Sequence, residues 1–142
     1  MPIITVKFAT PRHTGDFEAA IASEVAELSS SLLKKNPSLT AVVVERVPAN
    51  AWYVAGQSLE TLGKSSFWLS IKVVQGTNTK DEKALFVAAV FKRMADCLGD
   101  LHDESYVYVE EVYADSYGFG GRTQEERYIL ARHELIAAQG LA

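Results

Sequence analysis

The residue types that are scarce in this chain exclude several classes of function before any motif is considered. One cysteine, Cys97, among 142 residues leaves no partner for an internal disulfide. A formal net charge of −4 argues against nucleic acid as a partner, because phosphates bind to basic surfaces. His13, His102 and His133 are far apart and lack cysteine partners at metal-ligand spacing. We therefore expect no metal, no cofactor and no nucleic acid.

Long apolar runs are also missing. No stretch approaches the ~20 residues that a membrane-spanning helix needs, and residues 3–8 alternate instead of forming a signal peptide. These absences predict a cytoplasmic protein with no membrane contact. Hydrophobic residues still make up 48% of the chain, which is enough for a packed core. The length fits one domain over residues 1–142.

The apolar periodicity predicts an alternation of strands and helices. The expected strands are residues 3–8, 39–47, 67–74 and 106–112, and the expected helices are 16–35, 79–98 and 123–139. Thr79 and Glu82 form a capping box that opens the second helix. The expected core stripes are Phe17, Ile21, Val25, Leu28 and Leu32 on the first helix, and Val87, Val90, Phe91, Met94 and Leu98 on the second.

The second half of the chain repeats the first after 65 residues. This offset pairs Ile21 with Phe86, Val42 with Val107, and Trp52 with Tyr117 without a gap. We interpret the halves, about 2–57 and 67–122, as two βαβ units that each hold a parallel strand pair. The predicted fold is α/β (α+β): a four-stranded mixed sheet, joined antiparallel between the units, with two helices on one face.

Two features of this predicted fold point to self-association. Residues 41–44 and 67–69 are apolar in both phases, which predicts that both faces of the sheet are covered. The two helices cover one face only, so we expect the other to bind a second copy. The helix at 123–139 has a partial apolar stripe and could pack on its own sheet or on a neighbour.

Pro2 is the most informative residue for function. Initiator methionine is normally removed before a small second residue, so the mature chain would begin with the secondary amine of Pro2. An α-amino group titrates near ~8, and burial disfavours its charged form. Such an amine at the start of a strand can act as a general base near neutral pH. The structural alternative is an ordinary proline at a strand's first residue.

The chain resembles the tautomerase superfamily in the Met-Pro start, in Arg12 ten residues after Pro2, in the duplication and in the aromatic–glycine segments. Its first half is similar to 4-oxalocrotonate tautomerase. The two-unit length resembles macrophage migration inhibitory factor and the cis-3-chloroacrylic acid dehalogenase branch. The resemblance implies a homotrimer, with the N-terminal proline as base or acid on enol or α-keto acids.

The resemblance also implies roles for individual residues. Pro2 would be the general base, and Arg12 would bind a substrate carboxylate, which its planar guanidinium can do bidentately. Tyr108 matches a catalytic tyrosine of the dehalogenase. The remaining substrate-binding candidates are Trp52, Tyr106, Lys35 and Tyr117. Without the resemblance, Arg12 and Lys35 would be interpreted as solvated charges and the aromatic residues as packing.

Departures from the family pattern narrow the expected substrate. Ala41 stands where 4-oxalocrotonate tautomerase has a second arginine, and residues 74–77 lack the paired arginines of the dehalogenases and the decarboxylase. We therefore expect a cofactor-independent keto–enol tautomerase acting on a monocarboxylic acid with an apolar tail, such as phenylpyruvate. One alternative is a dehalogenase, hydratase or decarboxylase in which Asp115, Glu110 or Glu111 activates water. Another is a non-enzymatic binding or signalling protein.

Overall fold

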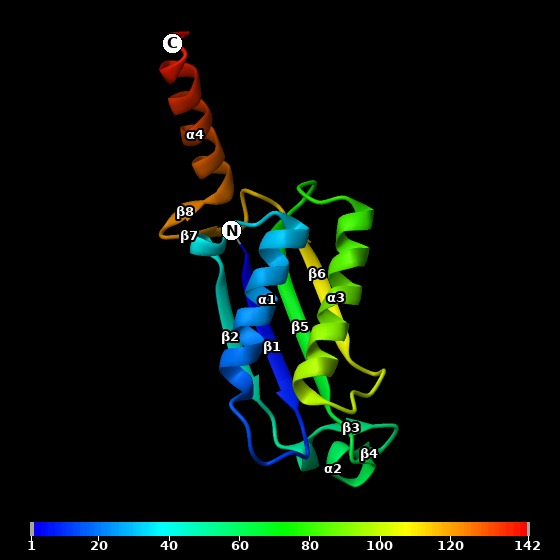
Figure 1. Ribbon diagram of the computed structural model, residues 1–142. Helices are drawn as coiled ribbons and strands as arrows, with labels where there is room; N and C mark the ends of the chain where they lie inside the picture. Colours follow the sequence, from blue (N-terminus) through cyan, green and yellow to red (C-terminus); the bar gives the residue numbers. More distant parts are fainter. Residues whose placement is uncertain (1, 142) are drawn as a thin grey trace.

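The computed structural model, which describes residues 2–141, shows a four-stranded sheet with helices on one face (Figure 1). The strands β1 (Ile3–Ala9), β2 (Ala41–Arg46), β5 (Ser66–Val74) and β6 (Tyr106–Val112) lie in the order β2-β1-β5-β6. The pairs β1–β2 and β5–β6 are parallel, whereas β1 and β5 are antiparallel. This topology confirms the predicted fold of two βαβ units.

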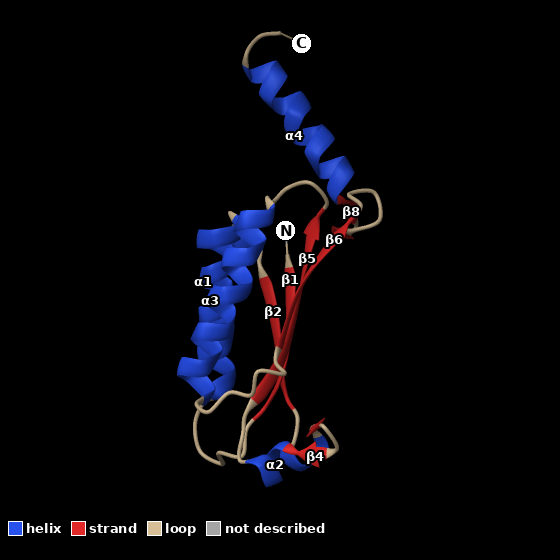
Figure 2. Ribbon diagram, turned by 90° about the vertical axis from the view of Figure 1, so that its right-hand side faces the viewer, coloured by secondary structure: helices blue, strands red, loops and turns tan. Residues whose placement is uncertain are grey.

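Two long helices, α1 (Phe17–Leu33) and α3 (Lys80–Leu98), pack side by side on the same face of the sheet (Figure 2). The predicted capping box is present: the Thr79 hydroxyl accepts from the Glu82 N–H, and the Glu82 carboxylate accepts from the Thr79 N–H. α1 ends earlier than predicted, because Lys34 adopts the left-handed conformation at φ 61° that ends helices.

The duplication is visible in the strand register. Ile3 lies opposite Ala41, and 65 residues later Trp68 lies opposite Tyr106. In the first unit, η1 (Pro37–Leu39) leads into β2, and the unit closes with η2 (Ala49–Ala51), the hairpin of β3 (Tyr53–Val54) and β4 (Gln57–Ser58), and α2 (Leu59–Leu62). The second unit closes with the hairpin of β7 (Gly118–Phe119) and β8 (Arg122–Thr123), followed by α4 (Gln124–Ala138). The two units differ mainly in the length of the helix that follows the hairpin.

The short helix of the first unit ends at a glycine. Gly63 ends α2 in the left-handed conformation at φ 63°, which glycine adopts without strain. Tyr128 stands 65 residues later and lets α4 continue. α4 projects away from the sheet and buries none of its residues (Figures 1 and 2). It therefore does not pack on its own sheet, which was one of the two predicted placements.

The core lies between the sheet and the two long helices. Among residues 2–141 it contains sixteen buried apolar side chains, including Phe8, Phe67 and Phe86. Phe86, not the predicted Val87, points into the core, and Val87 is exposed. Leu33 is likewise buried where Leu32 is only partly so. Both errors shift the helix phase by one residue, because neighbouring positions are apolar as well.

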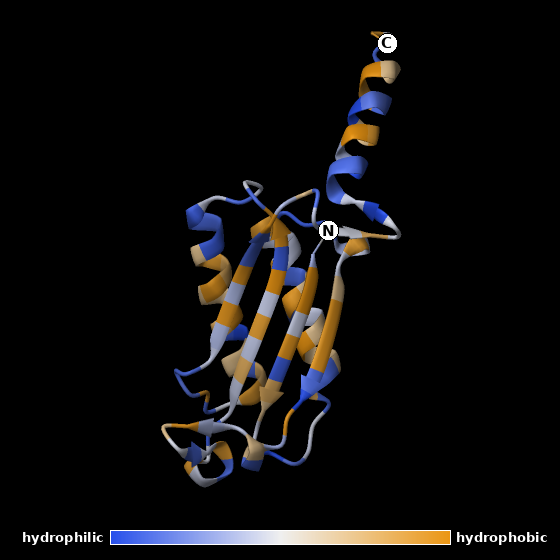
Figure 3. Cartoon of the chain, turned by 180° about the vertical axis from the view of Figure 1, so that it is seen from behind, coloured by the Kyte–Doolittle hydropathy of each residue, from blue (hydrophilic) through white to orange (hydrophobic). Residues whose placement is uncertain are grey.

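The other face of the sheet is bare in the isolated chain (Figure 3). Large apolar side chains stand exposed there, namely Ile3, Val43, Trp68, Tyr106 and Tyr108. Trp68 packs its ring 6.1 Å from that of Tyr106 and 6.5 Å from that of Tyr108. The ion pairs Lys7–Glu45 and Lys72–Glu110 join neighbouring strands of the sheet. A contiguous aromatic patch of this kind marks an interaction surface.

Two matched capping boxes allow a direct comparison of helix contributions. Thr79→Ala removes the cap of α3, which packs on the core, and should lower the free energy of unfolding by about 1 kcal/mol. Thr123→Ala removes the equivalent cap of α4, which buries none of its residues within the described chain, and should leave global unfolding unchanged. Urea denaturation followed by circular dichroism measures both. Equal losses in the two variants would contradict this view of α4.

Candidate functional site

Pro2 is buried at the start of β1 and lies in a pocket of about 430 Å³. The pocket is lined by Pro2, Ile3, Ser38, Leu39, Thr40, Ala41, Tyr117, Gly118 and Phe119. The carbonyl of Pro2 accepts a hydrogen bond from the Ala41 N–H at 3.2 Å, which fixes the first residue against β2. Leu39 and Phe119, which were not predicted as site residues, add apolar wall. Of the described side chains that line this pocket, none carries a charge.

Tyr117 is the predicted site residue that the structure places beside Pro2. Its hydroxyl accepts a hydrogen bond from the Ile3 N–H at 3.1 Å. Burial raises the pKa of the Tyr117 phenol, while the Ile3 N–H and the charge of Lys72 act in the opposite direction. The adjoining Gly118 is required by close packing, since a Cβ there would lie 2.2 Å from the carbonyl oxygen of Arg122.

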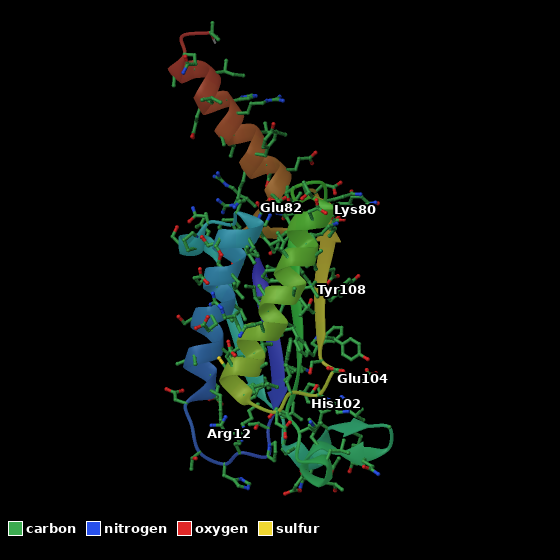
Figure 4. All side chains as sticks on the ribbon, turned by 45° about the vertical axis from the view of Figure 1, so that its right-hand side comes forward. Arg12, Lys80, Glu82, His102, Glu104 and Tyr108 are labelled. Carbon is green, nitrogen blue, oxygen red and sulfur yellow. The ribbon has the colours of Figure 1, made fainter. Side chains whose placement is uncertain are left out.

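Arg12 lies at the opposite end of the sheet from Pro2. Figure 4 labels it at the lower end of the molecule, whereas the N-terminus lies at the upper end in Figure 1. β1 separates the two residues by roughly 20 Å or more, at about 3.3 Å per residue. Arg12 is exposed, donates from Nη1 to the Leu98 carbonyl at 3.2 Å, and stacks over Phe17. One chain therefore does not bring Arg12 to its own Pro2.

Arg46 supports the loop that carries Arg12, a role that the sequence analysis missed. Its Nη2 donates to the carbonyl oxygens of Thr10 and Arg12, and its guanidinium lies 5.4 Å from the Phe17 ring centroid. Arg46 ends β2, the strand paired in parallel with β1, so the ends of both strands meet here. A charged residue after the apolar run 42–44 was the available signal.

The other aromatic candidates lie away from the Pro2 pocket. Trp52 follows β2 at the end that carries Arg12, and its carbonyl accepts from the Leu59 N–H at 2.9 Å. Tyr106 and Tyr108 stand on the bare face of the sheet, each about half exposed. The Tyr106 hydroxyl donates to the Glu104 carboxylate, and this bond raises the pKa of the Tyr106 phenol.

Lys35 lines a different pocket from Pro2, of about 460 Å³. Its Nζ donates to the Thr77 hydroxyl at 3.1 Å. Burial lowers the pKa of the Lys35 ammonium, and the nearby charge of Glu82 partly offsets that effect. Lys35 is therefore more than a solvated helix charge, but it does not line the pocket of Pro2.

The carboxylates considered as water-activating bases are mostly held in ion pairs. Glu110 lies 2.7 Å from Lys72, and Glu111 lies 3.2 Å from Lys83. Asp115 lines a shallow pocket beside Tyr117. Within residues 2–141, no group of three or more His, Cys, Asp or Glu is placed to hold a metal ion. No helix in the same range is long and apolar enough to span a membrane.

The Pro2 pocket and the Arg12 guanidinium differ in chemistry and lie at opposite ends of the sheet. The Pro2 pocket offers apolar walls and hydroxyls but no cation, while a guanidinium that suits carboxylate stands at the far end of the chain. A second copy that brings its Arg12 end to this pocket would complete the site. Pro2, Tyr117 and Phe119 would then belong to one chain and the carboxylate-binding group to another.

The sequence matches the family model described as tautomerase enzyme twice, over residues 2–62 and 68–127. The two matches cover the two βαβ units, the first ending with α2 and the second within the first turn of α4. No curated protein sequence is significantly similar to this chain.

Solved structures share the fold at low sequence identity. Pt0534 inactivated by 2-oxo-3-pentynoate has a TM-score of 0.75 and 13% identity, covering 88% of this chain and 98% of that one. A fused 4-OT solved as a symmetric trimer has a TM-score of 0.74 and 15% identity, covering 87% and 96%. A macrophage migration inhibitory factor-like protein from Entamoeba histolytica has a TM-score of 0.70 and 18% identity, covering 86% and 97%.

Proposed function

Because this chain belongs to the tautomerase family, we propose that it is a cofactor-independent keto–enol tautomerase whose general base is the N-terminal amine of Pro2. The substrate class is an enol or α-keto monocarboxylic acid with an apolar tail, such as phenylpyruvate. The observation that carries the proposal is the burial of Pro2 in a pocket walled by Leu39, Tyr117 and Phe119. The proposal requires removal of Met1, since an acylated proline nitrogen has no lone pair to accept a proton.

The active assembly is a homotrimer in which one copy supplies Pro2 and a neighbour supplies Arg12. Two observations support this arrangement: the separation of the two residues along β1, and the bare aromatic face of the sheet. A fused 4-OT of the same fold forms a symmetric trimer. Trp52 lies at the same end as Arg12, so the same neighbour would bring both a carboxylate ligand and an aromatic wall.

The chemistry is a proton transfer between oxygen and carbon of the substrate. The Pro2 nitrogen takes the proton of the enol hydroxyl, the carbonyl forms, and the protonated amine returns the proton to the adjacent carbon. Arg12 of the neighbour binds the carboxylate and stabilises the negative charge that develops on the substrate. The apolar walls exclude water and accept an aromatic tail.

The proposed reaction is tested by following the ketonisation of phenylenolpyruvate in a spectrophotometer, after intact-mass measurement has confirmed that Met1 is absent. The proposal predicts saturable turnover above the uncatalysed rate. Chloride release from 3-chloroacrylate, measured in parallel, tests the dehalogenase alternative. Chloride release without ketonisation would replace the tautomerase proposal with that alternative.

Tyr117→Phe tests the contribution of the phenol to the pocket. The ring and its apolar wall remain, but the Ile3 N–H loses its acceptor at the start of β1. We expect kcat/KM for phenylenolpyruvate to fall less than about tenfold, because one neutral hydrogen bond contributes about 1 kcal/mol. Tyr113→Phe, at an exposed position outside the Pro2 pocket, is the control. A loss of about 100-fold or more would assign the Tyr117 hydroxyl a direct chemical role instead.

A further inference from the structure

Arg127 covers one face of the Phe119 ring, which is a wall of the Pro2 pocket. Phe119 reaches the pocket from the hairpin of β7 and β8, whereas Arg127 lies in the first turn of α4 and does not line the pocket. Arg127 Cζ lies 3.7 Å from the centroid of the Phe119 ring, and Nη2 donates to the Phe119 carbonyl at 3.0 Å. Because the guanidinium covers one face at that distance, only the other face and the edge of the ring can meet the pocket.

The contacts of both residues with the rest of the chain are limited. Phe119 does not belong to the core between the sheet and the long helices, and no ring–ring contact within residues 2–141 includes it. None of the ion pairs among the same residues includes Arg127, and its Nε is buried without an acceptor there. Burial without a carboxylate partner costs the guanidinium hydration, and stacking on the ring offsets part of that cost.

Gly120 leaves room for this contact. A Cβ on Gly120 would lie 2.8 Å from Arg127 Nη2, so a larger residue there would displace the guanidinium. The left-handed backbone at Gly120, with φ 60°, does not by itself demand glycine, because Ala55 stands 65 residues earlier in the equivalent hairpin and adopts φ 52°. The approach of the guanidinium therefore gives a specific reason for glycine at position 120.

The stacked pair belongs to the hairpin that lies beside Pro2. At the positions equivalent to Phe119 and Arg127, 65 residues earlier, the first unit has Val54 and Leu62. The hairpin of the first unit lies at the opposite end of the sheet from the N-terminus (Figure 1). Of the two hairpins, only the one beside the proposed substrate pocket carries a cation stacked on an aromatic ring.

We propose that Arg127 is a positioning residue of the Pro2 pocket, which fixes the Phe119 ring as the surface on which the apolar tail of the substrate packs. The assignment rests on the proposed function for the class of substrate. A ring that is already held in place loses little freedom when a ligand packs on it, so the ligand binds more tightly. Because Arg127 acts through the ring and not on the reacting atoms, it should affect KM and leave kcat nearly unchanged.

The test ligand is 3-phenylpropionate, which has the carboxylate and the aromatic tail but no enol to react. Its binding to ¹⁵N-labelled, Met1-free protein is followed by NMR through the amides of Ile3, Ala41 and Gly118, which line the Pro2 pocket. Arg127→Met keeps an unbranched apolar side chain but removes the guanidinium, and should raise Kd by about fivefold to tenfold. Arg132→Met, at an exposed position of the same helix, is the matched control and should bind as the unmodified protein does.

A double-mutant cycle distinguishes action through the ring from a general loosening of α4. Phe119→Leu removes the aromatic face but keeps an apolar wall, and should weaken binding at least as much as Arg127→Met. If Arg127 acts through Phe119, adding Arg127→Met to Phe119→Leu should weaken binding no further. Gly120→Ala displaces the guanidinium while Arg127 is still present, so it should also raise Kd. Circular dichroism and the molar mass in solution verify that each variant folds and assembles.

The proposal is overturned if Arg127→Met leaves the Kd of 3-phenylpropionate unchanged, or if it weakens binding equally with and without Phe119→Leu. Absence of binding to the unmodified protein at millimolar 3-phenylpropionate would overturn it as well. Failure of the proposed function gives a different result, in which the Kd values change as expected but no variant turns over phenylenolpyruvate. In an active protein, Arg127→Met should raise KM by about the same factor as Kd, and a fall in kcat at unchanged KM would contradict a positioning role.

Discussion

Arg12→Ala will lower kcat/KM for phenylenolpyruvate ketonisation by about 100-fold or more while the trimer stays intact. This loss in kcat/KM is the size expected when one hydrogen-bond donor is removed from a site where negative charge develops on the substrate. Arg12 is exposed and its side chain contacts one backbone carbonyl and one ring, so its loss should cost little stability. Arg132→Ala, an exposed arginine of α4, is the control and should retain activity.

Mixing two inactive variants shows whether Arg12 acts across the subunit boundary. If Pro2 and Arg12 come from different copies, trimers assembled from Pro2→Ala and Arg12→Ala chains recover intact sites. When equal amounts of the two variants assemble at random, about a quarter of the sites contain both Pro2 and Arg12. Each site takes Pro2 from one chain and Arg12 from the next chain of the closed ring, and each of these chains carries the needed residue half of the time. Mixed trimers with no more activity than the separate variants would contradict the claim that Pro2 and Arg12 act from different copies.

Trp68→Glu will dissociate the trimer and thereby abolish ketonisation. Trp68 stands on the bare face of the sheet with its ring close to those of Tyr106 and Tyr108, and is 39% exposed in the single chain. Burying a carboxylate in that apolar contact without a partner carries a large desolvation cost. The activity should be lost with the assembly, since an isolated chain keeps Arg12 at the far end of the sheet from Pro2.

Leu85→Glu is the matched control for that experiment. Leu85 is a large apolar residue of α3, 59% exposed, on an element that packs on the opposite face of the sheet. The same change there should leave both the molar mass in solution and the activity unchanged. Light scattering coupled to gel filtration measures the assembly, and circular dichroism verifies that both variants are folded. A folded, active trimer of Trp68→Glu would rule out the bare face as the contact surface.

Periodicity was sufficient to predict the sheet and its helices. Alternating residues such as those of 3–8 identify one inward face, and the 65-residue offset is reproduced by the pairs Ile3–Ala41 and Trp68–Tyr106. Local periodicity did not determine the helix phase, because Leu85, Phe86 and Val87 are all apolar, although the 65-residue offset pairs Phe86 with the core residue Ile21. Local sequence does not contain that choice.

The directions of the strands, more than any sequence motif, determine which aromatic residue lies beside Pro2. β2 runs parallel to β1, so Trp52 after β2 lies with Arg12 at the far end from Pro2. β6 runs antiparallel to β1 through β5, which brings Tyr117 back to Pro2. The predicted antiparallel arrangement of the two units already implied that Trp52 and Tyr117 lie at opposite ends of the sheet. The separate pocket of Lys35 did not follow from sequence, because it depends on the base of α4.

The most direct test of the account is phenylenolpyruvate ketonisation by Met1-free protein compared with Pro2→Ala. Alanine still allows removal of Met1 but replaces the secondary amine with a primary one, without the ring that packs in the pocket. General acid–base catalysis of this kind contributes about 100-fold or more, so kcat should fall by that order in a variant that still assembles. Undiminished turnover by Pro2→Ala would contradict the claim that the secondary amine of Pro2 is the base.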